Sequence, residues 1–361
     1  MPAAPSTDLH LIRAARRAFT GPAALLHDPV HRDQSRRYLT DLARQDGREV
    51  PAGLFDTASE SLGQSYAEMA EALIGALVAP DEPVDLLVLA FSRHDMLPGR
   101  ATATYLSHVC PGTPLSFAVC DQGSAAAFSA LRLAHAYAAS GGCRRFLLIA
   151  VEQTVLPYAT STPGPARHQG VALLFRTTGQ DAAAPGAHPV PPDAATAAEP
   201  AGLPVGQGTD SAGPAGSTGD VVGASARLGV VRQHPAVPAD EVAARAASEL
   251  AALAAGRPDV RVVLSADLAA AWPAHPVEGV TVTPPGQPTT GLWWTLLDRL
   301  TDQPGRSRPV VAADYDPDLR YLCLVTWEDA ATADDGGRLR PDRRRTTGDD
   351  SGPTGEGRPD R

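Results

Sequence analysis

The stretch from Ser116 to Glu152 constrains the fold of this chain more than any other. A short apolar strand over Phe117 to Cys120 leads into a tight turn, and an alanine-rich helix begins near Ser124. The helix ends at Ser140-Gly141, where glycine is a common left-handed cap, and a second buried strand follows. The turn therefore places a residue at a helix N-terminus, where backbone N–H groups and the helix dipole can hold a nucleophile or a thioester carbonyl. The same arrangement is also a common way to join a strand to a helix.

Composition divides the 361 residues into parts that can and cannot form a core. Residues 177–227 are mostly Ala, Gly, Pro, Asp, Ser and Thr, which bury too little apolar surface to offset the entropy of ordering. Residues 332–361 have a similar composition. We therefore predict a first half over 1–176, a flexible insert over 177–227, a second half over 228–331 and a disordered tail over 332–361.

Charge and cysteine content exclude several classes of function. The net charge of −10 argues against a nucleic-acid surface. All 31 basic residues are Arg, so no lysine can form a Schiff base. The four cysteines show no metal-ligand spacing, the N-terminus has no apolar core of the signal-peptide kind, and no apolar run approaches the length of a membrane span. We expect reduced thiols, no metal, no tightly bound cofactor, no membrane partner and a cytoplasmic location.

Helical and strand patterns alternate on both sides of the insert. An amphipathic helix over 59–78 precedes a continuous apolar run over 84–91, which is typical of a strand buried on both faces. Residues 9–20 fit a strand or a helix, and 32–44 fit a helix. The second half repeats this alternation through a helix at 239–255, a strand at 260–264, a helix at 291–300 and closing strands at 310–314 and 319–327. The fold class is therefore α/β, with two pseudo-duplicated halves in layers.

The order of these elements resembles the thiolase fold, and within it the 3-oxoacyl-acyl-carrier-protein synthase III group of ketosynthases. The resemblance rests on VDLLVLAF, LPGRATATYLSHV and the strand–turn–helix stretch; it covers 59–176 and, more weakly, 239–327. It implies acyl transfer or condensation on an acyl-CoA or phosphopantetheine-linked thioester, as in polyketide or fatty-acid synthesis. It also implies an acyl carrier protein as partner and a homodimer, or a heterodimer with another ketosynthase.

Family members use Cys, His and Asn, and the resemblance puts all three positions on changed residues. The nucleophile position falls on Ser124, the histidine position on Ser265 and the asparagine position on Gln287. The turn also resembles that of the hydroxymethylglutaryl-CoA synthases, which would put the nucleophile on Cys120. The resemblance therefore implies the fold more firmly than the chemistry.

Each candidate residue also has a structural interpretation. Ser124 is either an activated nucleophile or an N-cap, and Cys120 is either the nucleophile or a buried, inert thiol. Gln287 keeps an amide that can donate to a thioester carbonyl, whereas Ser265 cannot replace a histidine base. Candidate bases are Asp121 and the histidines His94, His108, His135, His168 and His234. Candidate contacts for a carrier protein are Arg36, Arg37, Arg144 and Arg145.

Two functions follow. One is an acyltransferase in which Ser124 or Cys120 accepts an acyl group, without decarboxylative condensation because no residue is left to stabilise the enolate. The other is a catalytically silent ketosynthase-like subunit that binds an acyl carrier protein or pairs with an active synthase. A Ser124 hydroxyl within reach of a histidine would favour the first function, and a Ser124 bonded only to helix N–H groups the second.

Overall fold

The computed structural model describes residues 8–51, 53–55, 63–97, 101–156, 164–178, 220–257, 259–275, 279–301 and 308–329. All of these ranges lie within one compact unit of the chain. The predicted tail over 332–361 and most of the predicted insert lie outside the described residues. None of the described helices is both long and apolar enough to cross a membrane.

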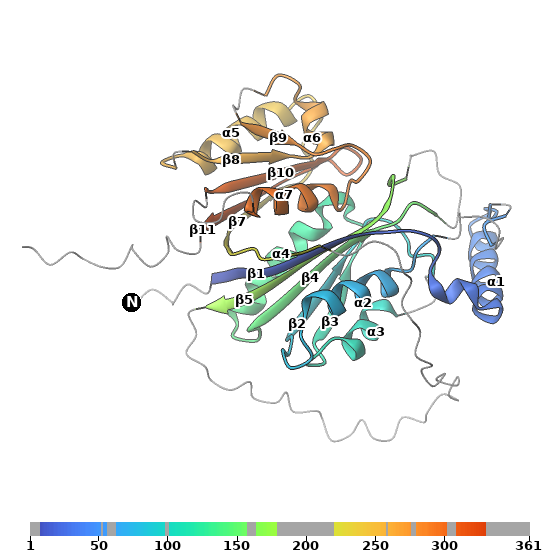
Figure 1. Cartoon of the computed structure of the whole chain (residues 1–361). Coiled ribbons are helices and arrows are strands. Elements are labelled where there is room, and N and C mark those ends of the chain that lie inside the picture. Colours follow the sequence, from blue (N-terminus) through green and yellow to red (C-terminus); the bar gives the residue numbers. More distant parts are fainter. Residues whose placement is uncertain are drawn as a thin grey trace, which may run out of the picture. The chain divides into compact units, whose positions relative to one another are not determined.

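The first half contains five strands and four α-helices (Figure 1). Its strands are β1 (Asp8–Phe19), β2 (Leu86–Ala90), β3 (Leu115–Val119), β4 (Arg145–Glu152) and β5 (His168–Thr178). Its helices are α1 (Pro29–Gln45), α2 (Tyr66–Leu77), α3 (Thr102–Val109) and α4 (Ala126–Ala139), with 3-10 turns η1 (Ala24–His27) and η3 (Gly123–Ala125).

The second half repeats the pattern. Its strands are β6 (Asp220–Val222), β7 (Ala226–His234), β8 (Arg261–Leu264), β9 (Val280–Val282), β10 (Val310–Asp316) and β11 (Tyr321–Asp329). Its helices are α5 (Val242–Ala254), α6 (Ala266–Ala271) and α7 (Gly291–Thr301).

Strand order shows the duplication directly. The strands of the first half are ordered β3-β2-β4-β5-β1, and those of the second half are ordered β9-β8-β10-β11-β7. In each half the three strands at one end are parallel, and the other two are antiparallel to their neighbours. The halves meet where β1 pairs with β7 over three residue pairs, and β6 adds a short pairing to β1. This repeated order confirms the predicted pseudo-duplicated fold class.

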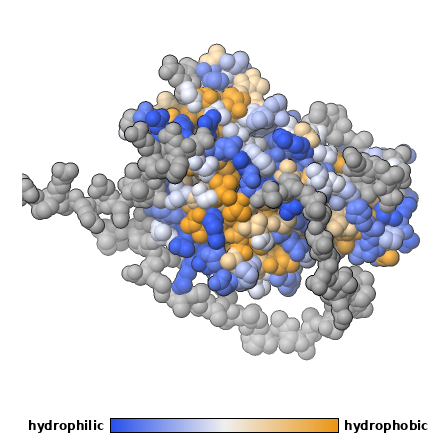
Figure 2. Space-filling view, in the orientation of Figure 1, coloured by the Kyte–Doolittle hydropathy of each residue, from blue (hydrophilic) through white to orange (hydrophobic). Residues whose placement is uncertain are grey.

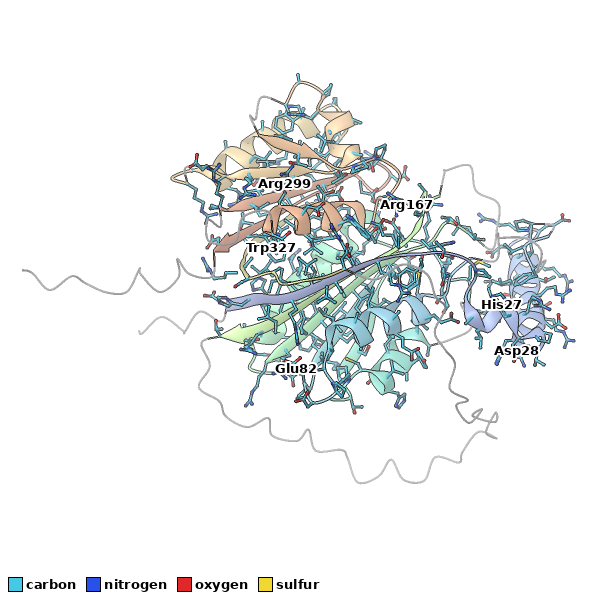
Figure 3. The ribbon with its side chains drawn as sticks, viewed as in Figure 1. His27, Asp28, Glu82, Arg167, Arg299 and Trp327 are labelled. Carbon is cyan, nitrogen blue, oxygen red and sulfur yellow. The ribbon has the colours of Figure 1, made fainter. Side chains whose placement is uncertain are left out.

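The helices form three layers around the two sheet halves. Alternate strand side chains point to opposite faces, so Val88 and Leu148 pack toward α4 while Leu87 and Leu147 pack toward α2 and α3. In the second half, α5 and α6 cover the outer face. Helices α4 and α7 share the central core with residues of both halves, including Trp293 and Trp327. Trp327 is labelled in Figure 3. The alanine content of α4 suits this central layer, because small side chains let two sheets pack closely around it.

Helix α1 lies apart from these layers. Its N-terminus is capped by Asp28, whose carboxylate accepts a hydrogen bond from the Val30 N–H at 2.8 Å (Figure 3). Only Leu39 and Ala43 of this helix are buried, and Figure 2 shows its surface as largely hydrophilic. Its arginines therefore lie at the surface, as the sequence predicts for Arg36 and Arg37.

Several element boundaries differ from the sequence prediction. The ambiguous segment at 9–20 is a strand, and the described part of the helix predicted over 59–78 begins only at Tyr66. Strand β5 extends to Thr178, while β6 and the start of β7 fall before residue 228, so regular structure enters the predicted insert at both ends. Gly141 ends α4 with a φ of 80°, as expected for a left-handed cap.

Candidate active site

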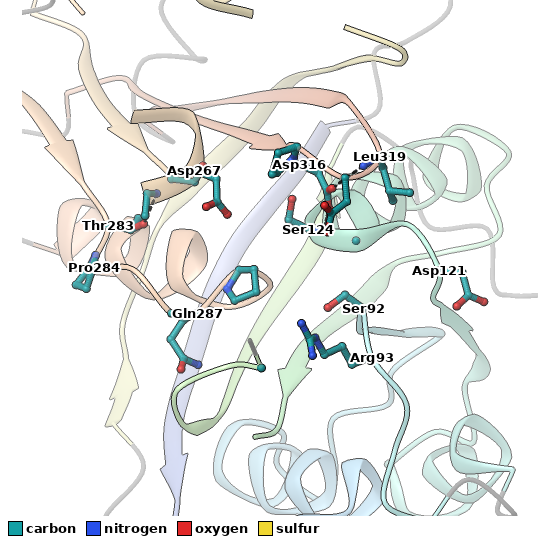
Figure 4. Close-up of a pocket in the computed structure, with 18 residues that line it drawn as sticks. Ser92, Arg93, Asp121, Ser124, Asp267, Thr283, Pro284, Gln287, Asp316 and Leu319 are labelled. Carbon is teal, nitrogen blue, oxygen red and sulfur yellow. Dashed lines mark hydrogen bonds between the residues drawn. The ribbon is translucent and has the colours of Figure 1, made fainter. Parts of the chain in front are cut away.

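A cavity of about 570 Å³ opens where the carboxyl ends of the parallel strands meet the N-terminus of α4 (Figure 4). Both halves contribute to its wall. Ser92 and Ser124 come from the first half, and Ser265, Gln287 and Asp316 come from the second. Three of the four residues predicted for catalysis, Ser124, Ser265 and Gln287, therefore lie around one cavity. Cys120 is not among the residues that line it.

Ser124 lies in the η3 turn directly before α4 and is only 5% exposed. Its backbone N–H donates a hydrogen bond of 2.9 Å to Oδ2 of Asp316. Its Oγ has no hydrogen-bond partner among the described residues. Asp316 packs so closely on this turn that a Cβ on Gly123, whose φ is +53°, would lie 1.8 Å from Asp316 Oδ2. The turn therefore places the buried Ser124 hydroxyl at the cavity wall. The backbone N–H of Ser124 is already hydrogen-bonded to the Asp316 carboxylate.

Asp314 and Asp316 end the middle strand of the second half, β10, on the face that packs toward α4. Asp314 is fully buried, and this burial raises its pKa to about 6. The Ser124 and Ser265 hydroxyls lie close enough to lower this pKa in part, although Ser124 Oγ makes no hydrogen bond of ordinary length and angle. Asp267 and Asp316 raise the pKa of Asp314 further through their negative charge.

Ser265 caps the N-terminus of α6. Its Oγ accepts a hydrogen bond of 3.1 Å from the Leu268 N–H, and its own N–H donates to the Ala313 carbonyl at 2.9 Å. At the position where the family resemblance implies a histidine, this serine acts as a helix cap and lines the cavity.

Gln287 has its amide engaged in internal hydrogen bonds. Its Nε2 donates to Glu152 Oε1 at 2.8 Å, and its Oε1 accepts from the Arg167 N–H at 2.8 Å. Glu152 also accepts from the backbone N–H groups of Thr289 and Thr290 at 3.1 and 3.0 Å. Burial raises the pKa of Glu152, and these hydrogen bonds partly offset that rise. The amide that could polarise a thioester is thus held in place by a buried glutamate.

Glu152 and Asp316 occupy equivalent places in the two halves. Glu152 is the last residue of β4, and its carboxylate binds N–H groups just before α7 of the other half. Asp316 is the last residue of β10, and its carboxylate binds the Ser124 N–H just before α4 of the other half. A strand-end carboxylate in each half therefore caps the central helix of the opposite half, where the helix dipole favours negative charge.

Cys120 has the environment of a weakly reactive thiol. It is half-buried directly after β3, and its Sγ lies 3.4 Å from Asp121 Oδ2 as a hydrogen-bond donor. Burial raises the pKa of this thiol, and the Asp121 carboxylate raises it further. Asp121 adopts a φ of 59° and lines the cavity, whereas the thiol does not.

No histidine in the described part of the chain lines the cavity. His168 Nδ1 accepts a hydrogen bond of 3.2 Å from the Thr154 N–H, and burial lowers its pKa. His234 Nε2 lies 3.2 Å from Glu249, burial lowers the pKa of His135, and His94 and His108 are exposed. The described residues also contain no group of three or more metal-ligating side chains that could hold an ion.

The arginine candidates occupy two other places. Arg36 and Arg37 lie on α1. The backbone N–H groups of Arg144 and Arg145 each donate to the Asp85 carboxylate at 2.8 Å, at the opposite end of the sheet from the cavity. Arg93 contributes the single basic side chain among the residues that line the cavity.

Sequence reasoning named Asp121 but missed the other acidic residues of the site. Asp267, Asp314, Asp316 and Asp318 all surround the cavity or lie beneath it. A signal was present, because ADYDPD places two aspartates on one face at the end of a closing strand. Glu152 was also at a strand end, but only the structure shows its partners across the two halves.

The layered, duplicated α/β architecture, with a cavity at the N-terminus of a central helix, is the thiolase-like fold. Solved structures of this class cover 89% of the chain with TM-scores of 0.50 to 0.52. They include a tetronic acid condensing enzyme, AbyA1 (15% identity, TM-score 0.52, 99% of that chain covered). A 3-oxoacyl-[acyl-carrier-protein] synthase III from Aquifex aeolicus VF5 (12%, 0.51, 99%) and the acyltransferase ChlB3 (17%, 0.50, 98%) are also similar.

No protein-family model matches the sequence. No curated protein matches it either. The structural likeness confirms the predicted resemblance to 3-oxoacyl-acyl-carrier-protein synthase III at the level of the fold. At these identities the chemistry has to be argued from the residues of the cavity.

Proposed function

We propose that this chain is a ketosynthase-III-like subunit without condensing activity, which binds an acyl thioester or acyl carrier protein and pairs with an active synthase. The observation that carries the proposal is the 2.9 Å hydrogen bond from the Ser124 N–H to the Asp316 carboxylate. Structural neighbours named as a condensing enzyme and an acyltransferase support acyl-thioester chemistry as its context.

The occupied N–H group argues against acyl transfer at the turn. Attack on a thioester needs hydrogen-bond donors aimed at the oxygen that becomes negative, and the N–H of the nucleophile at a helix N-terminus is the natural donor. Here that N–H is bonded to a carboxylate, with Asp314 buried beside it. An oxyanion would meet negative charge in place of a donor.

The residues at the positions of the family's histidine and asparagine support the same conclusion. Ser265 caps α6, and Gln287 is bonded to Glu152 and to the backbone of Arg167. Neither side chain resembles a proton acceptor that could activate a hydroxyl or stabilise an enolate. With these positions in structural roles, decarboxylative condensation lacks the groups that it requires.

A second function is favoured by one specific observation. The Ser124 Oγ is buried, has no described hydrogen-bond partner and lies near Asp314, whose pKa of about 6 is suited to accepting a proton near neutral pH. In this acyltransferase, Asp314 would take the Ser124 proton while Oγ attacks the thioester carbonyl; the C–S bond then breaks, and Asp314 returns the proton to the thiolate, which leaves as the thiol. Movement of Asp316 away from the turn would have to precede attack.

Intact-protein mass spectrometry separates the two functions. Wild type, Ser124→Ala and Cys120→Ala are incubated with acyl-CoA and acyl-carrier-protein thioesters. The silent subunit predicts no covalent adduct in any of the three proteins, together with a heterodimer in native mass spectrometry when an active ketosynthase of the same organism is added. An adduct lost only in Ser124→Ala would establish the acyltransferase, and one lost only in Cys120→Ala would move the nucleophile to the cysteine.

The wider setting follows from the same proposal. The acyl group arrives as a CoA or phosphopantetheine thioester in polyketide or fatty-acyl synthesis, and the protein needs no tightly bound cofactor. We propose a cytoplasmic homodimer or a heterodimer with a second ketosynthase as its working form.

A further inference from the structure

The cavity wall carries an excess of negative charge. Among the described residues that line it, four are aspartates, Asp121, Asp267, Asp316 and Asp318, and one is basic, Arg93. Asp314 lies buried beneath them, within electrostatic range of Asp267 and Asp316. An anionic ligand entering this space would be repelled by most of the charged groups that it meets.

Three of the carboxylates, those of Asp267, Asp316 and Asp318, and that of Asp314 beneath them act on one another, and among the described residues no basic side chain is a main cause of the pKa shift of Asp267 or Asp314. Burial raises the pKa of Asp267, and the charges of Asp316 and Asp318 raise it further. The groups that shift the pKa of Asp314 are burial, two hydroxyls and two other carboxylates. Neutralisation of these carboxylates would therefore be favourable, and a cationic ligand can supply the positive charge.

A second observation points independently to a ligand. Ser124 is 5% exposed and lines the cavity, and its Oγ makes no hydrogen bond of ordinary length and angle in the described structure, although it lies close enough to Asp314 to lower the pKa of that carboxyl. Buried polar atoms are rarely left unpaired, because the loss of a hydrogen bond to water is costly. Figure 4 shows this hydroxyl and the Asp267 and Asp316 side chains around the same space.

We propose that the cavity binds a small organic ammonium group, carried either by a free primary amine or by the acyl part of a thioester. An ammonium has three N–H donors, which matches the Asp267 and Asp316 carboxylates and the Ser124 oxygen. Pro284, Pro288 and Leu319 offer apolar contacts for the carbon chain beside it. This inference rests on the proposed function, because it names the ligand of the same cavity.

The size and make-up of the cavity select this occupant over a metal ion. About 570 Å³ is within the range of small-molecule sites and far exceeds the volume of one ion. Among the described residues, no three metal-ligating side chains converge as a coordination sphere requires. Spread carboxylates with an apolar wall suit an amine with a short carbon chain.

Isothermal titration calorimetry at pH 7 with matched ligands tests the inference. The free arm compares n-butylamine with n-butanol and butyrate, which share size and differ in charge. The thioester arm compares the N-acetylcysteamine thioesters of β-alanine and butyric acid. The test variant is Asp267→Asn combined with Asp318→Asn, and the control is Asp81→Asn, an exposed residue before β2 that does not line the cavity.

We expect the ammonium ligand of at least one arm to bind roughly tenfold or more tightly than its neutral counterpart, as expected for two nearby carboxylates. This preference should fall to about threefold or less in the double variant and persist in Asp81→Asn. The ligand pair that shows this preference identifies whether the ammonium group belongs to a free amine or to the acyl part of a thioester. Equal affinity for charged and neutral ligands, no binding of either amine, or a preference unchanged in the double variant would each overturn the inference.

These outcomes are independent of the test of the proposed function. An amine preference without a covalent adduct supports both proposals. An adduct at Ser124 contradicts the silent subunit whichever ligand binds better, and equal affinities without an adduct contradict only the amine.

Discussion

The Ser124 N–H donates to the Asp316 carboxylate across the interface between the two halves of the fold. The equivalent contact in the other direction joins Glu152 to the N–H groups of Thr289 and Thr290. The turn that would carry a nucleophile is therefore one of a pair of helix caps. Its chemistry and its structural role compete for the same backbone donor.

Removing the Asp316 carboxylate should destabilise the protein. Asp316→Ala leaves the N–H groups of Ser124 and Leu319 without their acceptor, which we expect to cost about 1–3 kcal/mol of unfolding free energy. Asp318→Ala, at a neighbouring position of the same loop, serves as the control with an expected change below about 0.5 kcal/mol. Urea unfolding followed by circular dichroism measures both, and equal stability of the two variants would contradict the cap.

The close approach of Asp316 to Gly123 predicts a difference between two glycines. A methyl group on Gly123 would overlap Asp316 Oδ2, whereas at Gly21 nothing lies within 4 Å, and both residues have positive φ. Both alanine variants suffer the cost of a left-handed backbone, and only Gly123→Ala adds the overlap. We expect Gly123→Ala to lower the melting temperature well beyond Gly21→Ala. Similar melting temperatures would show that the turn accommodates the added methyl group without a further loss of stability.

Asp314 should make stability fall as pH rises. Its pKa of about 6 exceeds the ordinary 3.8, so the folded state holds its proton more tightly than the unfolded state. The contribution of Asp314 to stability is greatest below pH 4, falls between pH 4 and 6, and above that is a penalty of about 3 kcal/mol. Asp314→Asn cannot ionise. Its free energy of unfolding, relative to that of wild type, should therefore rise by about this amount between pH 4 and pH 8. A difference that does not vary with pH would contradict the burial of a titrating carboxyl.

Glu152 should contribute to stability through its several donors. Glu152→Ala removes the acceptor of Gln287 Nε2 and of two backbone N–H groups, at an expected cost of about 3 kcal/mol or more. Glu152→Gln keeps one acceptor oxygen and the side-chain shape, so its cost should be smaller. Chemical denaturation ranks the variants, and an alanine variant as stable as the glutamine variant would contradict the network.

Cys120 should react slowly with thiol reagents. Burial raises the pKa of the thiol and Asp121 beside it raises this pKa further, so little thiolate exists at pH 7. Asp121→Asn removes this charge, and we expect iodoacetamide to modify Cys120 several times faster in the variant. Peptide mapping by mass spectrometry gives the rate at each cysteine, with the buried Cys143 as internal reference. A rate unaffected by the substitution would mean that burial alone controls this thiol.

The sequence predicts the fold well because its signals are local. The apolar run that forms β2, the alanine-rich α4 and its Gly141 cap each follow from neighbouring residues, and their order identifies the class of fold. The start of α2 was placed too early: Gly63 has a φ of 71° and Ser65 an extended backbone, although Gln64 and Ser65 are buried and continue the helical pattern.

The site was only half predictable. Ser124, Ser265 and Gln287 were located by position along the chain, and they do meet at one cavity. Their hydrogen-bond partners could not be predicted, because Asp316 lies 192 positions from Ser124 and Glu152 lies 135 positions from Gln287. Contacts between halves depend on how two sheets are placed around a central layer, which no local pattern encodes.

The turn residue and most of the carboxylates of the cavity are encoded in separate halves of the chain, although Arg93 and Asp121 belong to the first half. The hydroxyl of Ser124 belongs to the first half, whereas Asp267, Asp314, Asp316 and Asp318 all follow β8 or end β10 in the second. Recombination between β5 and β7 could therefore exchange the charge of the cavity while the residue at the turn stays the same. Ligand preference and reactivity can diverge independently in such a duplicated fold, and chimeras joined between residues 178 and 226 would inherit one without the other.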